Sequence, residues 1–367
     1  MALTGGRRTG RSFPVSPERG RRGDAEPDAD QPITAELFSI ERLEQHARTL
    51  AAAQRLRPAS DRGIAIRSRV AENGRVLVET YRVLAQAIKD ERTITPAAEW
   101  LVDNFSVVDE QLREIRDDLP ADYYRELPKL AGGHLDGYPR VLGLAWAYIA
   151  HTDSRFDPES LRRMVDAYQE VEPLTIGELW AIAISLRILY VENLRRLAER
   201  IVRSRADRQA ADEIADRLLG LGDHGSNDQS AALRGLSHAQ LSTAARVQLF
   251  QRLRDQDPEV TPALRELERL LTSQGTTADE LVQLEHQRMA TMNVTVRNVI
   301  TSMRLITWFD WAEFVESVGL VDKLLRSRGR FAAAAGPRGD PARCPDPDRV
   351  APSQQRIHRV HEVGGGQ

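Results

Sequence analysis

The 367-residue sequence predicts an all-α fold, a multi-helix array or bundle with a disordered tail at each end. Across most of the chain, apolar residues recur every three or four positions, the spacing that lines one face of a helix. Helix-start signals, in which Ser, Thr or Asp precedes a proline or a later Glu, appear repeatedly. No segment alternates convincingly as a strand would. The nearest candidate, Arg75 to Glu79, continues with helical spacing into Leu84 and Ile88, so a sheet is not required.

Composition and charge narrow the function classes. Hydrophobic residues make up 41%, charged residues 29% and aromatic residues 5% of the chain, which is typical of a soluble globular protein. Lys and Arg number 51 against 54 Asp and Glu, a balance that argues against nucleic acid as the main partner. The single cysteine, Cys344, excludes an intrachain disulfide and indicates a reducing compartment, so we expect a cytoplasmic protein.

The chain is expected to have three parts. Residues 1–32 form an Arg/Gly/Pro-rich tail without an apolar period, which predicts disorder. Residues 33–330 form the helical region, and residues 331–367 form a second disordered tail. The Arg7-Arg8 pair resembles a twin-arginine export signal, but no apolar stretch follows it, so we expect no cleaved signal.

The first half of the helical region contains three apolar periods. They predict helices over residues 34–57, over residues 70–88 and from Thr95 to Pro120. The third has Thr95 as its N-cap and Pro96 at its first position, where a missing N–H costs nothing. Residues 127–139 hold two prolines and several glycines and are expected to form a structured loop.

The central segment is the most apolar. Residues 138–150 are apolar on nearly every side except at Arg140, and Asp157-Pro158 starts the next helix. Thr175 and Glu178 match a capping box that begins a helix expected to run to about Arg205.

The first half of that helix, residues 179–191, is apolar all round apart from Ser185 and Arg187. It is shorter than the roughly 20 residues that cross a membrane, so we expect a core helix and no transmembrane segment. Arg187 is expected to pair with Glu178 or Glu192, and a bound anion is the second choice.

The remaining helices follow the same rules. Ser237 with Gln240, and Thr277 with Glu280, repeat the capping-box pattern. Helices are expected over residues 206–219, 239–253, 263–272, 279–305 and 308–326.

A glycine-rich segment has the spacing of a dinucleotide-binding loop. It runs from Gly220 to Gly225, but such a loop follows a strand, and the preceding residues read as helix. Gly220 is therefore interpreted as a helix C-cap.

Three Asp-x-Asp pairs could hold a divalent cation. We interpret them as chance occurrences in an acidic chain, and we interpret two histidines of the C-terminal tail as solvated rather than metal-bound. These residues are Asp28/Asp30, Asp255/Asp257, Asp346/Asp348, and His358 with His361.

Residue types used in nucleophilic catalysis occur together at His151–Ser154. Catalytic groups seldom neighbour one another in sequence, so we expect Asp153 or Ser154 to bond free backbone groups in a helix-terminus network. The five tryptophans are expected to be core anchors rather than a sugar platform, and Trp180→Ala is expected to cost about 3 to 5 kcal/mol. They are Trp100, Trp146, Trp180, Trp308 and Trp311.

Four long segments resemble the amino-terminal region of bacterial cyclic β-1,2-glucan synthases. They are LVDNFSVVDEQLREIRDDLP at residues 101–120, YYRELPKLAGGHLDGYPRVLGLAWAYIAHTDSRFDP at residues 123–158, EPLTIGELWAIAISLRILYVENLRRLAERIV at residues 172–202, and NVTVRNVITSMRLITWFDWAEFVESVGLVDKLLR at residues 293–326. The resemblance extends from about Thr34 to Arg330.

The resemblance implies a plan of three parts. A helical amino-terminal region precedes a membrane-embedded transferase, which uses UDP-glucose and a divalent cation, and a phosphorylase-like region follows. This chain matches the helical part, so we expect a non-catalytic scaffold, inactive alone, without catalytic, cofactor-binding or metal-binding residues of its own. Its expected partners are the transferase and phosphorylase-like domains, with this region on the cytoplasmic side of the inner membrane. After about Arg330 the chain departs from the family, which we interpret as a shifted reading frame or a truncated gene.

Two other function classes stay open. The first is a stand-alone helical adaptor that binds a protein partner through an apolar helix face such as Trp308 to Leu325. The second is an independent all-helical enzyme, which is the weakest because no polar constellation supports it.

Overall fold

A computed structural model describes residues 31–57, 65–118, 124, 126–219, 241–254, 261–273 and 275–320. The chain divides into two units, residues 1–319 and 320–367, and all described residues except Leu320 belong to the first. Within the described ranges there are eleven helices and one pair of two-residue strands, which confirms the predicted all-α class. The expected disorder of residues 1–30 and 331–367 falls on residues outside these ranges.

Helix α1 (Ile40–Ala53) begins later than predicted, at the N-cap Ser39. Residues 34–39 are extended instead, because the N–H groups of Ala35 and Phe38 donate to backbone oxygens at the end of a later helix, Ala150 and His151. Helix α2 (Ile66–Lys89) matches the second predicted period.

The third predicted helix is two helices, α3 (Pro96–Asp103) and α4 (Phe105–Asp118). The Thr95 cap and Pro96 are placed as predicted, but the chain breaks at Asn104. The buried Asn104 amide donates to the Trp100 carbonyl at 2.7 Å and accepts from the Arg304 guanidinium. This break depends on a residue two hundred positions away, which is why the local period did not reveal it.

The expected loop at 127–139 contains strand β2 (Lys129–Leu130), which pairs antiparallel with β1 (Leu56–Arg57). The prediction that no strand forms is therefore wrong for these four residues. Gly132, Gly133 and Gly137 have positive φ, as the tight return of the chain requires.

Three helices form the centre, α5 (Arg140–His151), α6 (Pro158–Gln169) and α7 (Ile176–Leu218). The Asp157 cap and the Thr175 capping box are confirmed. The end predicted near Arg205 is wrong, because α7 is 43 residues long and continues to Leu218. No helix breaker interrupts it, and Ala211, Ala215 and Leu218 of its last turns are buried.

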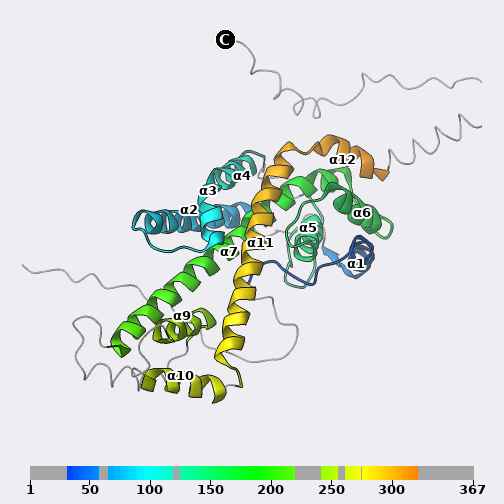
Figure 1. Ribbon diagram of the computed structural model, residues 1–367. Coiled ribbons are helices and arrows are strands. Elements are labelled where there is room, and N and C mark those ends of the chain that lie inside the picture. The colour runs from blue at the N-terminus through cyan, green and yellow to red at the C-terminus, as the bar shows by residue number, and fades with distance from the viewer. Residues whose placement is uncertain are drawn as a thin grey trace, which may run out of the picture. The chain divides into compact units, whose positions relative to one another are not determined.

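Helix α7 is the central element of the fold. It packs against α2, α4, α5, α9, α11 and α12, and Figure 1 shows it, in green, passing between the other helices. The main core holds Tyr148, Tyr168 and Tyr190, one from each central helix, all fully buried.

The C-terminal half of α7 has a smaller core of its own with α9 (Thr243–Arg254) and α10 (Thr261–Ser273). Next comes α11 (Ala278–Trp308), where the Thr277 capping box is confirmed, and then α12 (Trp311–Val318). The predicted helix 308–326 is therefore corrected, since Phe309 is the C-cap of α11 and Asp310 caps α12. The predicted capping box at Ser237 lies outside the described residues.

Candidate functional site

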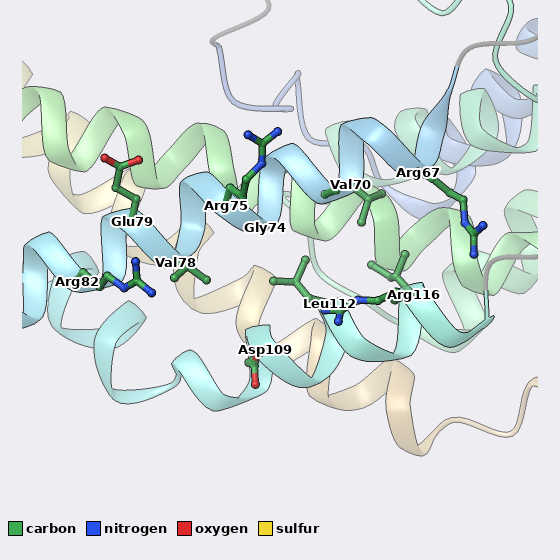
Figure 2. Close-up of a pocket in the computed structure, with 12 residues that line it drawn as sticks. Arg67, Val70, Gly74, Arg75, Val78, Glu79, Arg82, Asp109, Leu112 and Arg116 are labelled. Carbon is green, nitrogen blue, oxygen red and sulfur yellow. The ribbon is translucent and has the colours of Figure 1, made fainter. Parts of the chain in front are cut away.

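A groove of about 810 Å³ runs between α2 and α4. Figure 2 shows the two helices side by side, with Val78 and Leu112 directed into the space between them. Val70, Leu112 and Ile115 are buried and Val78 is half-buried, so the floor of the groove is apolar.

Gly74 shapes this floor. A Cβ at position 74 would lie 3.2 Å from Cδ2 of Leu112, a tighter contact than packed side chains normally make. The glycine therefore lets α4 approach the backbone of α2, and it leaves the middle of the groove without a side chain from α2.

Arginines border the groove. The exposed side chains of Arg67, Arg75 and Arg82 come from α2 and that of Arg116 from α4. None of the four makes an ion pair with any side chain that the structure describes. Their charges are therefore available at the surface.

The acidic residues of the groove do not balance these charges. Asp109 lines the groove, but its carboxylate is paired with Arg113 of the same helix at 2.5 Å. Glu79 is the other acidic side chain of the lining. The rim is therefore basic, although the whole chain has a net charge of −3.

A second cavity, of about 710 Å³, lies between the extended segment 31–35, α1, the loop that contains Gly132 and Gly133, and α5. Burial, with a smaller contribution from His151, lowers the pKa of His46, and burial followed by Arg196 lowers the pKa of His134. Burial therefore disfavours the charged form of both imidazoles. Arg196 is already bound to the Glu192 carboxylate at 2.8 Å and to the Gln31 carbonyl at 2.7 Å. This cavity offers fewer available charges than the groove, so the groove is the stronger candidate.

The segment from His151 to Ser154 forms a helix-terminus network, as expected, but the side chains of Asp153 and Ser154 bond other side chains and not the free backbone groups that were expected. The Asp153 carboxylate accepts from the Thr295 hydroxyl at 2.7 Å and from the Asn298 amide at 2.9 Å. Ser154 Oγ accepts from the Asn193 amide at 2.9 Å. These contacts join the end of α5 to α7 and α11.

Arg187 pairs with a carboxylate, as expected, but with a different one. Its partner is Glu114 of α4. The two carboxylates proposed from the sequence are engaged elsewhere, Glu178 by Arg140 and Glu192 by Arg69. Burial lowers the pKa of Arg187.

The tryptophan prediction is only partly right. Trp100, Trp146 and Trp311 are partly buried against the main core. Trp180 is 47% exposed and Trp308 is 89% exposed, so neither is a core anchor. The expected loss of 3 to 5 kcal/mol for Trp180→Ala is corrected accordingly, because that figure requires a buried ring.

The other candidates lie outside the described residues. They are the glycine segment Gly220–Gly225, all three Asp-x-Asp pairs, and His358 with His361. Among the described side chains, no three His, Cys, Asp or Glu residues gather as a metal site would require. The helices in the same part of the chain include none with the length and apolar character needed to span a membrane.

Sequence reasoning missed the groove arginines. A signal was present, because Arg67, Arg75 and Arg82 are spaced eight and seven residues apart and so share one face of a helix. Only the packing of α4 beside that face turns the basic stripe into a groove.

Comparison with known proteins shows which protein this chain resembles in sequence. No family model matches the chain. The chain is 40% identical over 271 residues to the cyclic beta-(1,2)-glucan synthase NdvB of Rhizobium meliloti (strain 1021), a match that covers 73% of this chain. The chain spans only 9% of the length of that relative. By sequence it is therefore similar to one segment of a cyclic beta-(1,2)-glucan synthase, which confirms the resemblance that its own residues indicated.

Proposed function

We propose that the chain is a non-catalytic helical scaffold portion of a cyclic β-1,2-glucan synthase-type glycosyltransferase. In this proposal the complete enzyme polymerises glucose from UDP-glucose with a divalent cation, and the helical unit packs against its transferase and phosphorylase-like domains. The unit lies on the cytoplasmic side of the inner membrane and is inactive alone.

One observation carries the proposal. The chain is 40% identical over 271 residues to a protein named as a cyclic beta-(1,2)-glucan synthase, and the described helices occupy most of the chain. Identity of this extent supports a common fold and a common structural task for the matched segment.

The pairing of buried carboxylates of α7 with arginines of neighbouring helices supports the scaffold role. Glu192 of α7 is bound by Arg69 of α2, and Glu178 of α7 is bound by Arg140 of α5. In both pairs the carboxylate is buried and joins one helix to another, whereas catalytic carboxylates need a face directed at a substrate. The described ionic core is therefore suited to holding the helices in a defined arrangement.

The test has two parts. The purified 367-residue chain, incubated with UDP-glucose and Mg²⁺ or Mn²⁺, is expected to release no UDP. Membranes that carry the relative without its matched 271 residues should then recover glucan synthesis when this chain is co-expressed. Turnover of UDP-glucose by the chain alone would overturn the non-catalytic assignment. Absence of recovery, with the chain present in the membranes at full level, would overturn the scaffold assignment.

One structural observation still supports the alternative function, a stand-alone adaptor that binds a protein partner. The face of α12 that the sequence suggested for docking is occupied within the unit, since Phe314, Val315 and Val318 are buried. Trp308, however, is exposed at the end of α11 together with Leu305. A monodisperse monomer in light scattering favours a free adaptor, and association through apolar surface favours a segment that packs on further domains.

A further inference from the structure

We infer that the groove between α2 and α4 binds an acidic amphipathic helix of a partner protein. This site goes beyond the proposed function and does not depend on it, because the inference rests on the shape and charge of the groove alone.

The floor of the groove suits a helix. The lining of α2 extends from Arg67 to Arg82, which at 1.5 Å per residue is about 22 Å, the length of a helix of about 15 residues. Val70, Val78 and Leu112 line this length, and the side chain of Leu112 packs over Gly74 between the two valines. Apolar side chains spaced three and four residues apart on a partner helix would meet this floor.

The arginines along the rim of the groove favour an acidic partner. Arg67 stands near one end of the groove and Arg82 near the other, and the side chain of Arg116 lies along α4 beside Leu112, as Figure 2 shows. Together with Arg75 they are four cations without a described ionic partner, and Asp109 is already paired with Arg113. Glutamates or aspartates along both edges of a partner helix would complement these charges.

The combination of floor and rim distinguishes this partner from other anions. A nucleic acid would use the arginines but would leave the apolar floor without a contact, because its outer surface is phosphate. A lipid surface favours a protruding amphipathic face, whereas these apolar side chains lie in a groove between two helices. A helix with an apolar stripe and acidic edges uses both features.

The probe for the test is a fluorescein-labelled model peptide of about 15 residues, with leucines on one helical face and glutamates on both edges. Binding to the full 367-residue chain is followed by fluorescence anisotropy. We expect saturable binding that weakens about tenfold or more at about 1 M salt, where the screening length falls to about 3 Å. Two reference peptides, one with the same residues in scrambled order and one with Lys in place of Glu, are expected to bind at least about tenfold more weakly.

Two variants locate the binding. The double substitution Arg75→Glu and Arg82→Glu should weaken the acidic peptide about tenfold or more, since it replaces attraction by repulsion at two rim positions. Ala71→Trp leaves every charge in place but fills the groove from an exposed lining position, and it should weaken binding to a similar degree.

The matched control is the double substitution Arg254→Glu and Arg265→Glu, which makes the same change of net charge at exposed positions on α9 and α10. It should change the dissociation constant by less than about twofold. Circular dichroism and thermal melting establish that each variant is folded. Because Ala71→Trp removes no buried side chain, it tests the groove even if the charge-reversed variant does not fold.

Three results would overturn the inference. The first is equal binding of the scrambled peptide, and the second is full binding by the folded Ala71→Trp variant. The third is binding of single-stranded RNA or of vesicles containing phosphatidylglycerol, lost in the Arg75→Glu and Arg82→Glu variant, without any binding of the acidic peptide.

Discussion

The guanidinium of Arg69 on α2 donates to the carboxylate of Glu192 on α7, with Nη2 2.7 Å from Oε1. Glu192 is almost fully buried, and it also accepts from the Asn73 amide at 2.7 Å and from the Arg196 guanidinium at 2.8 Å. One buried carboxylate thus connects two helices whose contributing residues lie more than a hundred positions apart in the chain.

This arrangement predicts a dependence of stability on pH. Burial alone would raise the pKa of Glu192, but the hydrogen bonds and charges of Arg69 and Arg196 outweigh it and lower the pKa from 4.5 to about 2. Because the folded pKa lies below the unfolded one, the stabilisation is complete above about pH 4.5 and is lost as the pH falls to about 2. At about 1.4 kcal/mol per pKa unit, the contribution is about 3 kcal/mol.

The variant Glu192→Gln isolates this effect. It should lower the free energy of unfolding by about 3 kcal/mol at pH 7, since Arg69 and Arg196 then face a neutral amide. The difference from wild type should shrink as the pH falls from about 4.5 toward 2. Urea denaturation followed by circular dichroism measures both quantities, and a difference that stays constant with pH would refute the assignment.

Arg140 forms a second buried pair. It is 3% exposed and binds Glu178, which is fully buried, while Nη2 also donates to the Pro173 carbonyl at 2.8 Å. Arg140→Met should cost about 3 to 5 kcal/mol, because it leaves the Glu178 charge buried without a partner.

A double-mutant cycle checks this prediction. Adding Glu178→Gln to Arg140→Met should recover part of the loss, since the unpaired charge is removed while a side-chain amide can still cap the start of α7. Urea denaturation of the four proteins gives the coupling energy. Strictly additive losses would show that the pair is not coupled.

Asp153 combines backbone strain with hydrogen bonding. Its φ is 50°, in the left-handed region, and its carboxylate holds Thr295 and Asn298 of α11. Asp153→Asn should cost less than Asp153→Ala, because Asn tolerates this conformation and keeps a carbonyl oxygen for Thr295. We expect about 2 kcal/mol for the alanine variant and about 1 kcal/mol or less for the asparagine variant in thermal melting. Equal losses would contradict the role of the side chain.

Trp180 and Tyr148 differ in burial, so their replacement by alanine should change the free energy of unfolding by different amounts. Trp180→Ala should change the free energy of unfolding by about 1 kcal/mol or less, since nearly half of the ring is in solvent. Tyr148→Ala should cost about 3 to 5 kcal/mol, because the ring is fully buried and its hydroxyl bonds the Asp157 backbone at 2.9 Å. Chemical denaturation of both variants gives the comparison, and a larger loss at position 180 would contradict the structure.

Burial was predicted less well than helix position. Trp180 follows the capping residues of α7 and sits in an apolar run, so the local pattern suggested a buried ring. In the folded unit, neighbouring helices surround the other sides of α7 and leave this position facing outward. An all-round apolar pattern does not identify the exposed side of a helix, because that side depends on which neighbours pack against it.

The groove likewise combines one feature that the sequence shows with another that depends on how the helices pack. The spacing of Arg67, Arg75 and Arg82 is readable in the sequence as one face of a helix. Whether such a stripe is a flat surface or one wall of a groove depends on α4, which is placed by its contacts with α2, α3, α7 and α11.

The sequence by itself determined where four of the described helices start. Thr95, Asp157, Thr175 and Thr277 act as caps for N–H groups only three residues further on, so the relevant interactions are local. Only the tertiary structure decided the break at Asn104, the ionic partner of Arg187 and the groove. Each depends on residues distant in sequence, whose separation in space is defined only after the helices have packed.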